Sequence, residues 1–206
     1  MHPLLCRFLG QDQAYEPIME AMKRFTEDRK PGQIDEIWFL EHQPVYTLGR
    51  AGEARHILSR DETPIIASNR GGQVTWHGPG QLVAYTLFDL ERLGMSVRMF
   101  VSALEQTVID LLQHYGIHGS GNPKAPGVYV EGAKIASIGL RIRRQYSYHG
   151  ISLNVCNDLD PFHHINPCGY PGLEVTRLSR LVSGIELIDV RKQWIQVFES
   201  RFGFSS

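Results

Sequence analysis

Long apolar segments are missing from this sequence. No run approaches the roughly eighteen apolar residues that a membrane-spanning helix needs. The first residues, MHPLLCRFLGQDQAYE, also lack the basic start and long apolar centre of a secretory signal. We therefore expect a cytoplasmic protein with no membrane partner.

The sequence also lacks a strong charge of either sign and has no low-complexity block. Its 206 residues carry a formal net charge of -1, with 42% hydrophobic and 21% charged residues, which is typical of a soluble protein. The overall charge gives no reason to expect a nucleic-acid partner or an anionic membrane surface. The length fits one domain spanning 1–206, which is long enough to bury a core.

Cysteine is scarce, with only Cys6, Cys156 and Cys168, and these three show no paired spacing. An odd, unpaired set argues against a disulfide framework and against a Cys-x-x-Cys metal site. No metal-binding spacing links His77 to His149, so we expect no bound metal. The cysteines should be free thiols, one of which could be reactive.

Glycine, in contrast, is concentrated in residues 70–81, RGGQVTWHGPGQ, directly before the apolar run QLVAYTLFDL. Glycine lets a backbone approach a ligand closely, and binding residues often lie on such loops. A plain turn is the alternative, but a turn needs only two to five residues and no interleaved Arg, Thr, Trp and His. We interpret this segment as a loop that cradles a ligand.

The hydrophobic pattern predicts an α+β fold with mixed, largely antiparallel sheets and about three helices. Helices are predicted over 11–29, from Ser96 to Gly116, and from a cap at Asp189 to Gly203. EIWFLEH and PVYTLGR read as two neighbouring strands, and PIIAS and QLVAYTLFDL as strands on either side of the glycine-rich loop. The three runs within 127–155 read as a meander, and a helical turn is expected around Leu178.

Two titratable side chains are predicted to point into apolar surroundings. With alternating side chains, Lys134 shares a strand face with Ala136 and Ile138, and His149 shares one with Ile151. Buried titratable groups usually have a partner or a function. For Lys134 the simpler alternative is a strand-end lysine that reaches water.

Cys168 lies in HHINPCGYPG, a segment too polar and too rich in Pro and Gly to be core. A loop thiol becomes nucleophilic when a nearby cation stabilises its thiolate, and Lys134 could be that cation. An incidental loop cysteine remains an equal alternative on chemistry alone. Cys6 and Cys156 adjoin apolar stretches and are interpreted as packing residues.

Four segments together resemble the lipoyl(octanoyl) transferase family: RGGQVTWHGPGQ, GAKIASIGLRIRR, YHGISLNV and NPCG. The resemblance covers essentially the whole chain and extends more distantly to the ATP-dependent lipoate and biotin protein ligases, which share the expected fold. It implies a catalytic Cys168 that carries the acyl group as a thioester and a catalytic Lys134 that stabilises the thiolate. Trp76 stands where the family usually has another aromatic residue. The implied acyl-binding residues are Arg70, Gly71, Gly72, Gln73, Val74, Thr75, Trp76, His77, Ser137, Ile138, Gly139, Gly150, Ile151 and Ser152, with His149 and Gly78 as possible supporting residues.

The resemblance further implies a reaction without a cofactor. An octanoyl or lipoyl group would pass from acyl carrier protein to a lysine of a lipoyl domain, in 2-oxoacid dehydrogenase complexes or in the glycine cleavage H protein. The alternatives are an ATP-dependent lipoate or biotin ligase, a non-catalytic acyl-binding module and a cysteine hydrolase. The basic edge of Arg141, Arg143 and Arg144 is either a solvated strand end or a docking site for the acidic carrier.

Overall fold

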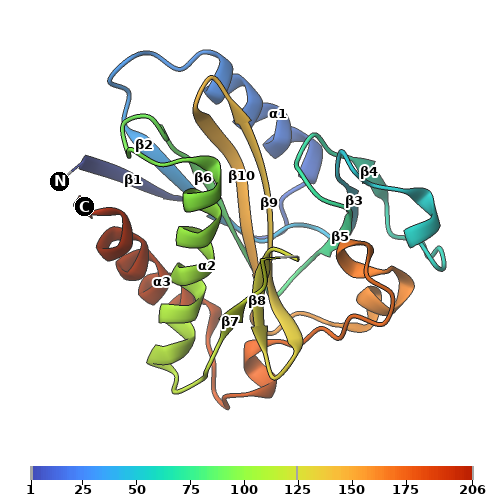
Figure 1. The fold of residues 1–206 in the computed structure, drawn as a ribbon. Coiled ribbons are helices and arrows are strands. Elements are labelled where there is room, and N and C mark those ends of the chain that lie inside the picture. Colours follow the sequence, from blue (N-terminus) through green and yellow to red (C-terminus); the bar gives the residue numbers. More distant parts are fainter. Residues whose placement is uncertain (1, 124, 206) are drawn as a thin grey trace.

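Three α-helices form in the protein, whose computed structural model describes residues 2–123 and 125–205 (Figure 1). Ser96 caps the second helix by accepting a hydrogen bond from the Met99 N–H at 3.3 Å. Gly203, in the left-handed conformation, ends the third. The predicted helices are confirmed, except that the third begins before Asp189, which lies within its first turn instead of capping it. Their bounds are α1 (Tyr15–Glu27), α2 (Val97–His114) and α3 (Leu187–Phe202).

The larger sheet has eight strands in the order β11-β1-β2-β6-β10-β9-β8-β7. Within the part of this sheet that the structure describes, β1 pairs in parallel with β11 and β2, and the other pairs are antiparallel, which confirms the expected mixed, largely antiparallel sheet. The predicted meander is confirmed as β8, β9 and β10. The strands are β1 (His2–Phe8), β2 (Asp35–Leu40), β6 (Gln81–Leu87), β7 (Ser120–Gly121), β8 (Gly127–Val130), β9 (Ala133–Arg143), β10 (Tyr146–Asn154) and β11 (Phe204–Ser205).

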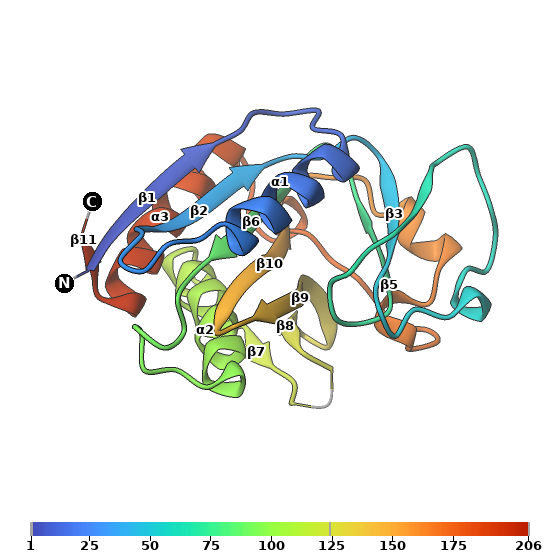
Figure 2. The same ribbon diagram turned by 90° about the horizontal axis from the view of Figure 1, so that it is seen from above.

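Helices cover both faces of the larger sheet (Figures 1 and 2). On one face α2 and α3 lie side by side and bury Leu104 and Trp194 in the main apolar core. On the other face α1 buries Met22 against Trp38 and Tyr85. Among the described residues, no helix is long and apolar enough to cross a membrane.

A smaller sheet, in the order β4-β3-β5, lies beside the larger one (Figure 1). Its strands are β3 (Val45–Leu48), β4 (Ile65–Ala67) and β5 (Val74–His77). The prediction that EIWFLEH and PVYTLGR are neighbouring strands is therefore wrong, because β2 and β3 belong to different sheets. Part of the glycine-rich segment, expected to be a loop, is strand β5.

Short 3₁₀ turns connect these layers. The turn that carries Cys168 packs against β5, so the smaller sheet supports the candidate nucleophile. The helical turn expected around Leu178 is present. The turns are η1 (Ala54–His56), η2 (Asp160–His164), η3 (Pro167–Gly169) and η4 (Leu178–Arg180).

Local irregularities reverse two predicted side-chain directions. The register of β8 and β9 shifts so that Val128 faces Ala136 while Tyr129 faces Lys134, which leaves an extra residue in β9. Val128 and Ala136 join the main core, so Lys134 projects from the opposite face, and the prediction that it shares a face with Ala136 is wrong.

The second irregularity is at His149. Its φ of 59° interrupts the alternation of β10, so its ring stacks on Tyr148 and lies edge-on to Tyr85, on the α1 side. Ile151 faces the main core instead. The predicted shared face of His149 and Ile151 is therefore wrong, although the prediction that His149 is buried is confirmed.

Candidate active site

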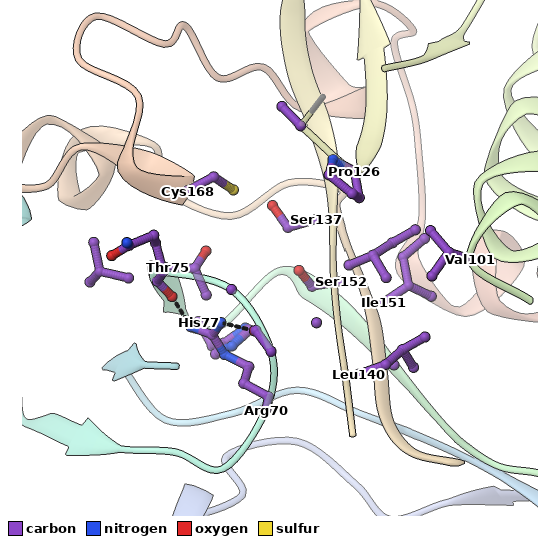
Figure 3. A pocket seen from close by; sticks show the side chains of 18 of the residues that line it. Arg70, Thr75, His77, Val101, Pro126, Ser137, Leu140, Ile151, Ser152 and Cys168 are labelled. Carbon is purple, nitrogen blue, oxygen red and sulfur yellow. Dashed lines mark hydrogen bonds between the residues drawn. The ribbon is translucent and has the colours of Figure 1, made fainter. Parts of the chain in front are cut away.

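A cavity of about 360 Å³ lies between the glycine-rich segment, strands β9 and β10, and helix α2 (Figure 3). Its lining atoms are mostly apolar, and Cys168 lies at its edge. The cavity brings together nearly all of the residues that the family resemblance implies for acyl binding. Those that line it are Arg70, Gly71, Gly72, Gln73, Val74, Thr75, His77, Ser137, Ile138, Gly139, Gly150, Ile151 and Ser152.

Trp76 does not line the cavity. Successive side chains on β5 point to opposite sides, so Thr75 and His77 face the cavity and Trp76 packs edge-to-face on Phe162, at 5.8 Å between ring centroids. Gly78 is also outside the cavity wall. A Cβ atom there would lie 2.2 Å from the Trp76 ring, so Gly78 makes room for the indole instead of the substrate.

One wall of the cavity is not predicted by the sequence. Val97 and Val101, one helical turn apart on α2, complete the apolar lining opposite the glycine-rich segment. Hydrophobic spacing along a helix cannot separate a cavity wall from a core contact, so the sequence alone does not single out these two valines. The other missed lining residues are Val83, Ala125, Pro126, Leu140 and Tyr170.

Arg70 holds the glycine-rich segment in place through hydrogen bonds to backbone oxygens. Its buried guanidinium donates to the backbone oxygens of Thr47, Gly71 and Gln73, and to the Thr47 hydroxyl. Burial lowers its pKa from the usual value. The Gly71 N–H donates to the Leu140 carbonyl at 2.8 Å, which joins the glycine-rich segment to β9. Arg70 therefore stabilises the cavity wall through backbone contacts.

Cys168 and Lys134 meet at the edge of the cavity. Lys134 Nζ donates to Cys168 Sγ at 3.0 Å and to the Pro126 carbonyl at 2.9 Å. The Lys134 side chain is 2% exposed, and burial alone would lower its pKa. The electrostatic interaction and hydrogen bond with Cys168, together with Tyr129, outweigh burial and raise the Lys134 pKa above its usual value. The arrangement favours an ammonium–thiolate pair.

The turn around Cys168 holds the sulfur in place. Cys168 adopts a left-handed backbone conformation, with φ 56° and ψ 16°. Such a conformation costs a non-glycine residue roughly 1–3 kcal/mol, and residues held in it cluster at active sites and ligand contacts. Bonds from the Gly169 N–H to the Asn166 carbonyl and from the Asn166 N–H to the His56 carbonyl brace the turn.

The other two cysteines have less reactive surroundings. Burial, with a smaller effect of Glu199, raises the pKa of Cys6 to about 11. Cys156 is exposed, so its interpretation as a packing residue is wrong; partial burial of its sulfur and the nearby Glu41 still raise its pKa. Because the thiolate is the reactive form, both thiols are less nucleophilic at neutral pH.

The histidine beside the cavity is neutral. His77 Nδ1 lies 2.7 Å from Gln81 Oε1, and Gln81 in turn donates through Nε2 to Asn154 Oδ1 at 2.9 Å. Because an amide oxygen only accepts, His77 donates through Nδ1 and keeps Nε2 as an acceptor. Burial, with the nearby His42 and Arg70, lowers the His77 pKa well below its usual value.

Two further buried histidines, His42 and His149, lie outside the cavity lining. Burial lowers the pKa of His42 to about 4 and, with the nearby Arg70, that of His149 to about 3. His149 does not line the cavity, and its Nε2 donates to Asn69 Oδ1 at 2.6 Å. These histidines stay uncharged at neutral pH, which suits a cavity for an uncharged apolar chain.

One arginine of the predicted basic edge already has an acidic partner within the chain. Arg143 forms an ion pair with Glu27, whereas Arg141 lines a separate depression together with Arg50. Within the described part of the chain, no cluster of three or more His, Cys, Asp or Glu residues could hold a metal ion.

The chain is similar to a known protein family and to individual enzymes of that family. The family model for the lipoyl protein ligase A/B catalytic domain matches residues 14–199. The chain is 59% identical over 179 residues to an octanoyltransferase of Pseudomonas entomophila, with 87% of this chain and 83% of that protein covered. It is 50% identical over 205 residues to an octanoyltransferase of Coxiella burnetii, with 100% of this chain and 85% of that protein covered.

Solved structures share the fold at much lower identity. A bi-partite lipoate protein ligase from Thermoplasma acidophilum superposes with a TM-score of 0.80 at 14% identity, covering 100% of this chain and 86% of that one. Lipoate-protein ligase A bound with ATP gives 0.79 at 15% identity, covering 99% and 86%. These likenesses confirm the expected ligase-like fold.

Proposed function

Because the chain belongs to the lipoyl protein ligase A/B catalytic domain family, and within it to the octanoyltransferases, we propose that it transfers acyl groups through a thioester on Cys168. The donor is octanoyl-acyl carrier protein and the acceptor is a lysine of a lipoyl domain, in 2-oxoacid dehydrogenase complexes or the glycine cleavage H protein. We place this reaction in the cytoplasm and assign it to one catalytic domain spanning 1–206.

One observation carries the proposal: the 3.0 Å contact between Lys134 Nζ and Cys168 Sγ at the edge of a mostly apolar cavity. A thiolate beside an ammonium is both a nucleophile and a neighbour to a proton donor. The cavity offers an uncharged space for an alkyl chain attached to that sulfur. Acyl transfer needs these three features together.

In the first half-reaction the Cys168 thiolate attacks the carbonyl carbon of the octanoyl thioester. The bond to the carrier's sulfur breaks, and Lys134 gives a proton to the leaving thiolate. The products are a Cys168 octanoyl thioester, a free carrier thiol and a neutral Lys134. Exchange of one thioester for another is close to neutral in free energy, so this step is reversible.

In the second half-reaction the acceptor lysine attacks the Cys168 thioester as a free amine. Neutral Lys134 accepts a proton from the attacking nitrogen, and the Cys168 thiolate leaves. The product is an amide, and the ammonium–thiolate pair is restored. Formation of the more stable amide drives the cycle.

Octanoyl transfer should proceed without ATP. The bond energy of the donor thioester is kept in the enzyme thioester, so no nucleotide is needed, whereas a ligase must activate a free acid. Purified protein mixed with octanoyl-carrier and a lipoyl domain should yield the octanoyl-lipoyl domain, measured by intact mass. Octanoic acid with ATP in place of octanoyl-carrier is the matched control. Product formed only with free acid and ATP would support a ligase instead.

A further inference from the structure

We propose that Tyr129 is a positioning residue of this reaction, which holds the Lys134 ammonium against Cys168 through its ring and hydroxyl. The inference rests on the proposed function, because it concerns the same Cys168–Lys134 pair. Three observations carry it: the cross-strand pairing of Tyr129 with Lys134, the contact of the ring with the ammonium, and the anchoring of the Ala125–Pro126 turn.

Pairing across the strands brings the two side chains together. The register shift between β8 and β9 sets Tyr129 directly opposite Lys134, on the face away from the main core. Directly opposed residues in an antiparallel pair have neighbouring side chains. With regular pairing through this point, Lys134 would have faced the core, away from Cys168.

The ring of Tyr129 lies against the ammonium. Lys134 Nζ is 5.2 Å from the ring centroid, within the range of a cation–π contact. Tyr129 is 8% exposed and Lys134 2%, so water screens this contact little. Burial raises the pKa of Tyr129, so its hydroxyl keeps its proton. An uncharged aromatic ring thus stabilises the ammonium without competing with the thiolate for it.

The hydroxyl of Tyr129 anchors the second partner of Lys134. It donates to the Ala125 carbonyl at 2.7 Å, and the Glu105 carboxylate accepts from the Gly127 N–H at 2.9 Å. These bonds fix both ends of a short turn whose middle residue, Pro126, presents its carbonyl to Lys134 Nζ. The ammonium is therefore held by a carbonyl, a sulfur and an aromatic ring.

Gly127 completes this arrangement. A Cβ atom at Gly127 would lie 2.6 Å from Lys134 Cε and 2.4 Å from the Ala136 carbonyl oxygen. The missing side chain gives the lysine a path to the cavity edge. The segment Ala125–Tyr129 thus provides a carbonyl, an aromatic ring and the free space that a protonated lysine needs.

The test measures the alkylation rate of Cys168 by iodoacetamide from pH 6 to 10, resolved by peptide mass spectrometry. Tyr129→Phe keeps the ring and removes the hydroxyl, and Tyr129→Leu removes both. At pH 7 we expect Tyr129→Leu to react about tenfold more slowly than the unsubstituted protein and Tyr129→Phe about threefold more slowly. All three rates should converge at pH 10, where the thiolate forms without help.

Tyr115→Leu, a tyrosine substitution at the far end of α2, is the matched control and should label normally. Equal rates for all proteins at pH 7 would overturn the inference. So would a loss by the same factor at every pH, because that indicates altered access to the sulfur. Octanoylation of Cys168 is followed in parallel samples of the same proteins that receive octanoyl-carrier and no iodoacetamide. If the unsubstituted protein is never acylated there, the proposed function fails; if it is acylated and only the labelling prediction fails, the role of Tyr129 alone is rejected.

Discussion

Replacing Cys168 with serine lowers octanoyl transfer by about 10⁴-fold or more, because removing the nucleophile removes the covalent route. A hydroxyl at this position is a far weaker nucleophile than a thiolate and gains little from the ammonium of Lys134. Serine is close to cysteine in size, so the fold should be unaffected. The measurement is the steady-state rate of lipoyl-domain octanoylation, with circular dichroism to check folding.

Cys156→Ser provides the matched control, because Cys156 is an exposed thiol outside the cavity. It should transfer octanoyl at the normal rate. If Cys168→Ser retained most of the activity while Cys156→Ser lost it, the nucleophile would be assigned to the wrong cysteine.

Replacing Lys134 with methionine lowers the transfer rate by about 10²–10⁴-fold, the usual contribution of a positioned proton donor and acceptor. Methionine retains most of the buried stem and removes only the ammonium. Because the Lys134 pKa is raised, the unsubstituted protein keeps its ammonium at and above neutral pH. The acylation rate that depends on the ammonium should therefore not fall between pH 6 and 10, because the raised Lys134 pKa lies above that range. The measurement is the single-turnover acylation rate of Cys168 from pH 6 to 10.

Lys134→Arg keeps the positive charge but does not readily release a proton. It should retain more thiolate at neutral pH than Lys134→Met and still fail in the second half-reaction, where Lys134 accepts a proton. Equal acylation rates for the unsubstituted protein and Lys134→Met at pH 7 would contradict a role for the ammonium.

The parts of the fold that the sequence predicted are those with local signals. The cap at Ser96 and the stop at Gly116 predict α2, and the runs within 127–155 predict the meander. Strand β1 was missed, because its pairs with β2 and β11 join distant segments. The placement of β2 and β3 in different sheets also depends on tertiary structure. Both sequences favour strands, but neither shows which strand it pairs with.

In the candidate site, too, residue types are visible in the sequence whereas contacts that depend on tertiary structure are not. Cys168 and Lys134 stand out by residue type, but their contact depends on an irregular β9 that alternation rules do not anticipate. His149 was misplaced for a similar reason, because its positive φ is not visible in the sequence. Val97 and Val101 lie on a helix whose apolar spacing does not show which residues line a cavity, and only the packing of α2 beside the cavity reveals their role.

The most direct test of the thioester account is to trap the enzyme between its half-reactions. The protein is mixed with octanoyl-carrier without any acceptor, quenched in acid within one turnover, digested, and mapped by mass spectrometry. We expect octanoyl on the peptide containing Cys168, released by hydroxylamine and passed to a lipoyl-domain lysine when the acceptor is added before the quench. Octanoyl on another residue, or transfer to the lipoyl domain with no acylated Cys168 at any time, would contradict it.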